Sequence, residues 1–357
     1  MRFLPLLGFL ATLLALSSVS AAPASPTDPP SDETISVPSG EARAPSARDL
    51  APHDLRGTSS EVWSYSFFFD SGAQAYLSFR RVNLGGVLGS AGGAELSLVG
   101  FNGETIRAAK QYDLDEFRYD ASAHRLNVHP NIFFEGRPPE AHRVRFQAGK
   151  NGRSYAVDLS FASMARGVTW GDGEFRVGDE RFGLFVHIPF ARVSGAITVD
   201  GTTTSVSGVA YMDHTYQTGS PKTLASAIRY VSYDGDTIEA ANLALPGDGF
   251  ERQVLGYGLL REGGQTRLLK PTDLRVVSTR PALGADLPRQ TLVTYQGGRE
   301  TVLSRSQDRQ QIATLEELGG IARTLARQFL GGEAIIARGV GTLGSGARAY
   351  YELVGVK

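Results

Sequence analysis

Short stretches in which apolar and polar residues alternate recur along most of this chain, and glycine-rich turns separate them. The clearest stretch is residues 153–161, whose apolar face is Tyr155, Val157, Leu159 and Phe161. A period of two is typical of a strand with one buried face. From residue 61 onward no strand–helix alternation is visible. The pattern therefore predicts an all-β protein with antiparallel sheets.

A predicted hairpin in the middle of the chain carries its densest group of polar and aromatic residues. The first strand covers residues 192–199, and Asp200-Gly201 is a favoured two-residue hairpin turn. The return strand begins apolar and ends with Tyr211, Asp213, His214, Tyr216 and Gln217. We expect such a strand to deliver side chains into a cavity or its mouth.

A segment near the C-terminus has helical spacing instead. Apolar residues recur at helical intervals over residues 315–330. Thr314 and Glu317 form a capping-box pattern, and Gly331-Gly332 follows as a stop. The pattern predicts one C-terminal amphipathic helix, packed on or across a barrel.

The N-terminal residues are typical of a secretory signal peptide. Arg2 precedes an apolar run over residues 3–16, and small residues end at Ala21. The run is shorter than the roughly 20 residues that cross a bilayer. We therefore expect signal cleavage after residue 21, no integral membrane span afterwards, and an exported protein that is periplasmic or secreted. A retained N-terminal anchor is the alternative.

Residues 22–58 are rich in Pro, Ser, Ala and Asp and show no apolar period. Such a segment buries too little apolar surface to offset its ordering entropy. The composition predicts a disordered leader.

Composition removes several classes of function. The net charge of -1 provides no basic field to hold nucleic acid. The absence of cysteine excludes disulfides, thiolate catalysis and cysteine metal sites. His124 and His129 have no carboxylate at a ligand-like offset, and no glycine-rich phosphate loop precedes a helix. We predict neither a metal nor a cofactor.

Two segments far apart in the chain share a short pattern. Residues 209–213 and 348–352 both contain Ala-Tyr, one further residue and an acid. The repeat indicates two similar β domains, which we place at residues 59–200 and 201–357.

Four segments, residues 61–65, 192–195, 208–214 and 351–355, carry a resemblance to a known superfamily. The chain resembles the bacterial hydroxyneurosporene synthases (carotenoid 1,2-hydratases), the AttH-like proteins and the fungal survival-factor proteins. This resemblance implies two lipocalin-like antiparallel β-barrel domains. The chain departs from the superfamily pattern at Ala210, where Gly is usual, and at residues 215–217, where a polar residue, Trp and Gly are usual.

The resemblance leaves two main functions open, because members include a hydratase, pericyclic cyclases and lipid carriers. The first is an exported carrier, a monomer that binds an apolar small molecule such as a lipid, isoprenoid or carotenoid. The second is a cofactor-free hydratase or cyclase acting on an isoprenoid- or carotenoid-type substrate. The Trp missing beside Asp213-His214 favours the carrier. A structural module is a third reading, if side chains fill both barrels.

Candidate site residues follow from these alternatives. In an enzyme, Asp213 is the general acid, because an apolar cavity favours its neutral form, and His214 and Tyr216 hold water or stabilise a cation. The residues expected to contact a ligand are Tyr211, Trp170, Gln217, Trp63 and Tyr350. Consecutive strand residues point to opposite faces, so Asp213 and His214 are not expected to form a simple dyad. The structural alternative is that both hydrogen-bond across the domain interface.

Overall fold

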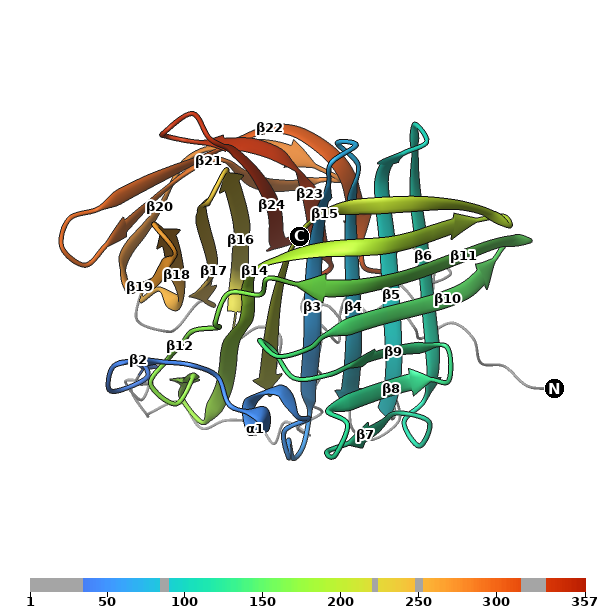
Figure 1. The fold of residues 1–357 in the computed structure, drawn as a ribbon. Helices are drawn as coiled ribbons and strands as arrows, with labels where there is room; N and C mark the ends of the chain where they lie inside the picture. The colour runs from blue at the N-terminus through green and yellow to red at the C-terminus, as the bar shows by residue number, and fades with distance from the viewer. Residues whose placement is uncertain (1–34, 84–89, 220–223, 248–252, 316–331) are drawn as a thin grey trace.

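In the structure, a computed structural model shown in Figure 1, the described residues are 35–83, 90–219, 224–247, 253–315 and 332–357. They form antiparallel sheets, as the alternation predicts. The predicted signal peptide lies outside these residues, as does the predicted helix apart from its first residue, Leu315. Within the described ranges no helix has the length and apolar character needed to span a membrane.

The first sheet has 13 strands in the described chain and folds over on itself into two layers (Figure 1). Its order is β6-β5-β4-β3-β15-β14-β11-β10-β9-β8-β7, with β13 on β14 and β1 on β13. The strands are β1 (Ile35–Ser36), β3 (Ser59–Phe69), β4 (Gln74–Asn83), β5 (Ser90–Phe101), β6 (Glu104–Asp113), β7 (Arg118–Asp120), β8 (Arg125–His129), β9 (Ile132–Glu135), β10 (Arg143–Lys150), β11 (Arg153–Ala162), β13 (Glu174–Val177), β14 (Glu180–Val199) and β15 (Thr202–Thr218). The layers enclose an apolar core that includes Tyr65, Leu96 and Phe146.

The second sheet has nine strands in the order β19-β18-β17-β16-β24-β23-β22-β21-β20. The strands are β16 (Leu224–Asp234), β17 (Thr237–Pro246), β18 (Leu255–Glu262), β19 (Gln265–Leu269), β20 (Pro271–Ala282), β21 (Ala285–Tyr295), β22 (Glu300–Ala313), β23 (Ala334–Leu343) and β24 (Arg348–Val356). This sheet curves around its own apolar core, which includes Leu243, Val293 and Leu353 (Figure 1). A separate two-stranded ribbon of β2 (Ala42–Arg43) and β12 (Thr169–Trp170) packs beside β14.

The predicted central hairpin is present as β14 and β15. Register shifts around Ile188 interrupt their pairing, and β14 pairs with β13 on one side of the shifts and with β11 on the other. β15 continues beside β3 as far as Thr218. The chain therefore changes sheet between Thr218 and Leu224 and not at residue 200, because β15 is the strand that joins β3 to β14.

Residues 35–58, predicted as part of a disordered leader, are ordered and pack on the first sheet. β1 pairs with β13, β2 pairs with β12, and the short helix α1 (Ala47–Leu50) buries Leu50. The carbonyl oxygens of Asp49 and Leu50 accept hydrogen bonds from the rings of His214 and Trp63. The prediction is wrong for these residues because the sheet supplies partners that composition does not reveal.

The two sheets meet along a buried seam, which we define as the region between β3, β4, β5 and β15 of the first sheet and β16, β17, β23 and β24 of the second (Figure 1). An apolar cluster next to it includes Phe182, Tyr211 and Leu255. Ion pairs also cross the seam, with Arg229 Nε 3.2 Å from Asp213 Oδ2 and Arg338 Nη1 3.1 Å from Glu95 Oε1. Buried charges need partners of this kind.

Candidate functional site

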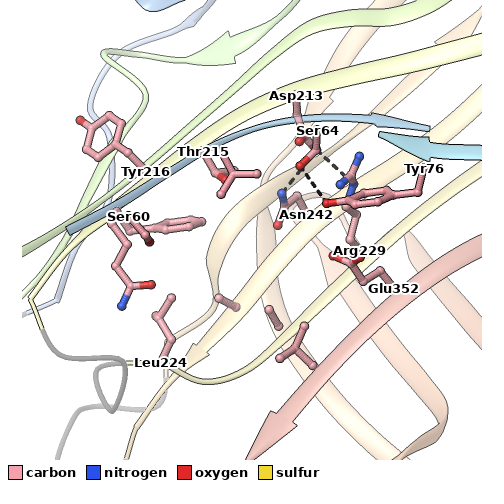
Figure 2. Close-up of a pocket in the computed structure, with 16 residues that line it drawn as sticks. Ser60, Ser64, Tyr76, Asp213, Thr215, Tyr216, Leu224, Arg229, Asn242 and Glu352 are labelled. Atoms are coloured by element: carbon pink, nitrogen blue, oxygen red, sulfur yellow. Dashed lines mark hydrogen bonds and ion pairs between the residues drawn. The ribbon is translucent and has the colours of Figure 1, made fainter. Parts of the chain in front are cut away.

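Asp213 is held in the seam by the pairing of β15. It pairs with Ser64 on β3 and with Val186 on β14, and its exposed fraction is 0%. With Ser64, Tyr76 and Arg229 it lines a cavity of about 90 Å³ between the sheets, called the polar cavity below (Figure 2). The carboxyl group therefore borders a small polar space to which both sheets contribute.

Among the described residues, only one of the two oxygens of the Asp213 carboxyl group has an ion-pair or hydrogen-bond partner. Oδ2 lies 3.2 Å from Arg229 Nε and accepts a hydrogen bond from Asn242 Nδ2 at 3.5 Å. Oδ1 has no hydrogen-bond partner among the residues that the structure describes. Burial raises the pKa of Asp213 above its usual value, and the charge of Arg229 and the hydroxyl of Tyr211 oppose this rise without cancelling it. A raised pKa increases the fraction of the carboxyl that holds a proton at a given pH, which favours a general acid.

Tyr76 occupies the seam beside Asp213. Its hydroxyl lies 3.2 Å from Ser64 Oγ. The guanidinium of Arg338 lies 3.9 Å from the centre of its ring and that of Arg229 lies 5.7 Å away, so both cations contact the ring face. Burial raises the pKa of Tyr76, which therefore stays neutral.

Buried arginines and carboxyl groups are paired in and beside the seam. Three arginines and three carboxyl groups are each less than a tenth exposed: Arg80, Glu95, Asp213, Arg229, Arg338 and Glu352. Each member has an ion-pair partner within this set. Because neither sheet contributes a complete set, the network exists only when the two sheets are joined.

His214 points to the opposite side of β15 from Asp213, as strand alternation requires. Its ring stacks on Trp63, with centroids 4.3 Å apart and planes inclined by 15°. Nδ1 lies 2.7 Å from the Asp49 carbonyl oxygen, and Nε2 lies 3.0 Å from Glu61 Oε1. Asp213 and His214 thus belong to different networks and do not form a dyad.

The hydrogen-bond partners of the two ring nitrogens of His214 determine where the protons of the His214–Glu61 pair lie. A carbonyl oxygen only accepts, so Nδ1 of His214 donates to Asp49, and another proton must lie between Nε2 and Glu61. Burial alone would raise the pKa of Glu61, but hydrogen bonds from His214 and His53 and the charge of Arg81 lower it to about 2. Burial lowers the pKa of His214, against the hydrogen bond and charge of Glu61. One proton therefore lies between Nε2 of His214 and Oε1 of Glu61.

His53, Glu61 and His214 also resemble a metal-ligand set. Their ligand atoms lie within 4.8 Å of one another, and two imidazoles with a carboxylate can bind zinc. Here His53 Nδ1 lies 2.9 Å from Glu61 Oε1, and Arg81 Nε donates to Glu61 Oε2 at 2.8 Å. Because Arg81 already supplies the cation, we assign the group to a hydrogen-bonded network that holds the N-terminal segment on the sheet.

Tyr216 and Gln217 line the polar cavity together with Asp213. The Tyr216 hydroxyl nevertheless donates to Glu174 Oε2 at 2.7 Å, and its side chain lies apart from Asp213 (Figure 2). Tyr211 is buried, and its ring centre lies 5.3 Å from the Arg229 guanidinium. Of the predicted residues, Asp213, Tyr216 and Gln217 thus line the polar cavity.

Three predicted ligand contacts lie away from the polar cavity. Trp63 is in the core of the first sheet, where Nε1 donates to the Leu50 carbonyl at 2.9 Å. Trp170 Nε1 donates to the Gly40 carbonyl at 3.3 Å, and Lys270 lies over the ring at 4.6 Å. Tyr350 lines a different cavity. These residues were predicted as ligand contacts because all three are aromatic, but the structure places them in different regions.

Several residues around Asp213 were not predicted. Arg229 lies between Ile228 and Tyr230 in a largely apolar strand, and Glu352 is flanked in the same way. A charge within a buried strand is a signal that could have found both, since such residues are rarely buried without a partner. Ser64, Tyr76 and Asn242 carry no comparable signal.

Comparison with known proteins identifies solved structures that share this fold. The sequence matches no protein-family model and no curated protein. A solved structure described as AttH, from Nitrosomonas europaea, has a TM-score of 0.62 at 18% identity, over 87% of this chain and 96% of that one. The chain therefore has an AttH-like fold.

Two further solved structures are similar. Kievitone hydratase from Nectria haematococca has a TM-score of 0.53 at 15% identity, over 87% of this chain and 92% of its own. CghA, solved with Sch210972, has a TM-score of 0.51 at 12% identity, over 84% of this chain and 89% of its own. At identities this low, the similarity defines the fold and not the activity.

Proposed function

We propose that this protein is a cofactor-free hydratase or cyclase in which Asp213 protonates a carbon–carbon double bond of an isoprenoid- or carotenoid-type substrate. The observation that carries the proposal is the buried Asp213 carboxyl at the polar cavity, with a raised pKa and an Oδ1 that has no partner among the described residues. The fold shared with kievitone hydratase supports a reaction of this type.

The proposed reaction begins with proton transfer. The O–H bond of Asp213 breaks as a C–H bond forms at one alkene carbon, and the neighbouring carbon becomes cationic. In a hydratase, water adds to this carbon and returns a proton to the carboxylate. In a cyclase, a second double bond of the substrate adds instead, and a carbon-bound proton is lost to the carboxylate. Arg229 and Asn242 hold the carboxylate between these steps.

The size of the polar cavity favours the enzyme over the carrier. Its volume of about 90 Å³ equals that of about three water molecules, which suits the reacting end of a substrate with water and not a whole lipid. The apolar faces of both sheets pack into cores, which include Phe67 and Leu243. In this proposal the protein is exported and acts as a monomer in the periplasm or outside the cell.

Turnover in heavy water tests the proposal. Wild-type protein incubated with a panel of isoprenoid alkenes is expected to form a product with carbon-bound deuterium. Asp213→Asn should lower this rate at least about a hundredfold, because general acid catalysis contributes that much or more. Asp236→Asn, at an exposed turn, is the matched control and should keep the full rate.

Asparagine at position 213 can still accept the hydrogen bonds of Arg229 and Asn242, so the variant should fold, which circular dichroism checks. Turnover that persists in Asp213→Asn contradicts the proposal. A bound apolar compound that solvent extraction recovers unchanged and in stoichiometric amount, with no turnover in the wild type, supports the carrier instead.

A further inference from the structure

A second cavity lies in the same seam, two residues further along each strand from the polar cavity. Tyr76, Arg229 and Glu352 line the polar cavity, and the next residues on the same strand faces, Gln74, Val231 and Tyr350, line the second. Two residues of a strand correspond to about 7 Å. β3 and β4 lie next to β16 and β24 there (Figure 1). The two cavities are thus neighbours with different linings.

Four aromatic side chains contribute to the walls of this second cavity, and we call it the aromatic cavity. Its volume is about 190 Å³, and its lining includes Phe68, Phe69, Tyr233 and Tyr350. Phe68 and Tyr350 meet edge to face, with ring centroids 5.6 Å apart. A cavity of about 150 Å³ with apolar walls is large enough for benzene. The aromatic cavity therefore has the size and surface for one six-membered ring.

Gln74 adds a polar group to this lining. Its exposed fraction is 6%, and Oε1 has no hydrogen-bond partner among the described residues. Buried polar atoms are normally paired, so an unpaired amide beside a cavity indicates a partner that the protein itself does not supply. Arg348 also lines the cavity and is exposed, which places a cation at its edge. A ring that carries a hydroxyl group matches both features.

We propose that the aromatic cavity is a second binding site, which takes a single hydroxylated ring of the phenol type. The ring stacks among Phe68, Tyr233 and Tyr350, and its hydroxyl bonds to the side-chain amide of Gln74. This site does not depend on chemistry at Asp213, because none of the residues that hold the ring also holds that carboxyl. The ring belongs either to a separate small molecule or to the far end of the substrate that reacts in the polar cavity.

Calorimetric titration of the full chain with phenol and with toluene tests the site. Phenol should bind at one site, about tenfold more tightly than toluene, because only phenol pairs with Gln74. Gln74→Leu should remove this preference without lowering the melting temperature, since leucine leaves no buried amide unpaired. Gln147→Leu, the same change at an exposed position on β10, should keep the preference.

Val231→Phe fills the cavity and should abolish phenol binding. The proposal is overturned if the wild type does not bind phenol, if it binds phenol and toluene equally, or if folded Gln74→Leu keeps the tenfold preference. Deuteration by Val231→Phe of isoprenoid alkenes that carry a phenol ring, if the wild type turns them over, then separates the two sources of the ring. Loss of turnover assigns it to the substrate, and unchanged turnover assigns it to a separate molecule.

Failure of the proposed enzyme and failure of this site are distinguishable. Phenol binding is measured without turnover, so it can be present in a protein that never reacts. Asp213→Asn should bind phenol as the wild type does, whatever its effect on chemistry.

Discussion

At the scale of single residues, the number of hydrogen-bond donors distinguishes two equally buried carboxyl groups. Glu61 Oε1 lies within 3.0 Å of ring nitrogens of His53 and His214, and Arg81 donates to Oε2. Asp213 is 0% exposed, as Glu61 is, yet its Oδ1 has no partner in the described chain. Burial therefore dominates at Asp213 and donors dominate at Glu61, so their pKa values move in opposite directions.

The lowered pKa of Glu61 predicts an acid-sensitive part of the stability. The pKa falls from 4.5 to about 2 on folding, so this stability is present above pH 4.5 and is lost as the pH falls toward 2. By this linkage Glu61→Gln should lower the free energy of unfolding at neutral pH by about 3 kcal/mol. The deficit relative to the wild type should shrink below pH 4.5. Urea unfolding at a series of pH values measures it, and a constant deficit down to pH 2 would contradict the assignment.

A residue's role could be predicted from the sequence when it follows from the residue's own strand. It could not be predicted when the contacting residues come from the other sheet. Strand alternation correctly separated Asp213 from His214, because it is a local property of β15. Arg229 and Asn242 reach Asp213 from the other sheet, and no local pattern specifies that contact. Asp49, which accepts the His214 hydrogen bond, lies in a segment whose composition predicted disorder.

At the scale of elements, the N-terminal segment is part of the first sheet's structure. Residues 35–58 have no apolar period, and yet β1, β2 and α1 all find partners. Leu50 is 1% exposed within the core of the first sheet, and its carbonyl caps the buried indole of Trp63. Composition indicates only how much apolar surface a segment can bury by itself. It therefore underestimates the order of a segment that packs on a folded sheet.

This docking predicts a measurable cost for one substitution. Leu50→Ala should lower the free energy of unfolding by about 2 to 4 kcal/mol, because it leaves a cavity in the core. Chemical denaturation followed by tryptophan fluorescence reports it, since Trp63 contacts this residue. Leu55→Ala is a control in the same segment, where the side chain is half-buried. If Leu50→Ala costs no more than this control, the segment does not contribute to the core.

At the scale of the whole molecule, the seam joins two sheets through charges that neither sheet can satisfy alone. Arg338, on β23, pairs with Glu95 of the first sheet and with Glu352 of its own sheet. Buried ion pairs add little net stability, but loss of one partner leaves a charge uncompensated. The seam therefore fixes how the sheets meet, and with them the walls of both cavities.

Arg338→Met should therefore lower the free energy of unfolding by about 3 kcal/mol or more. Adding Glu352→Gln should recover part of this loss, because it removes the carboxylate left unpaired. Arg153→Met breaks ion pairs whose arginine side chain is 41% exposed and should cost much less, because solvent screens them. Urea unfolding of the three variants tests this order. Equal effects of Arg338→Met and Arg153→Met would show that the seam carries no such constraint.

The sequence predicted the overall architecture better than its division. Alternation and turn residues indicated antiparallel β structure and the hairpin around residue 200, because both are local patterns. They did not indicate that both strands of that hairpin belong to the first sheet, since a turn does not specify which sheet its strands complete. The cavities likewise arise from packing between the sheets, which no local pattern records.

The most direct test of the account is an NMR titration of the Asp213 side-chain carboxyl carbon in the intact protein, with Asp213→Asn to assign the signal. The proposed general acid requires a midpoint above the ordinary value of 3.8, because burial outweighs the charge of Arg229. A midpoint at or below 3.8 would mean that Asp213 is an ordinary ion-pair partner of Arg229, and the proposed protonation chemistry would be wrong.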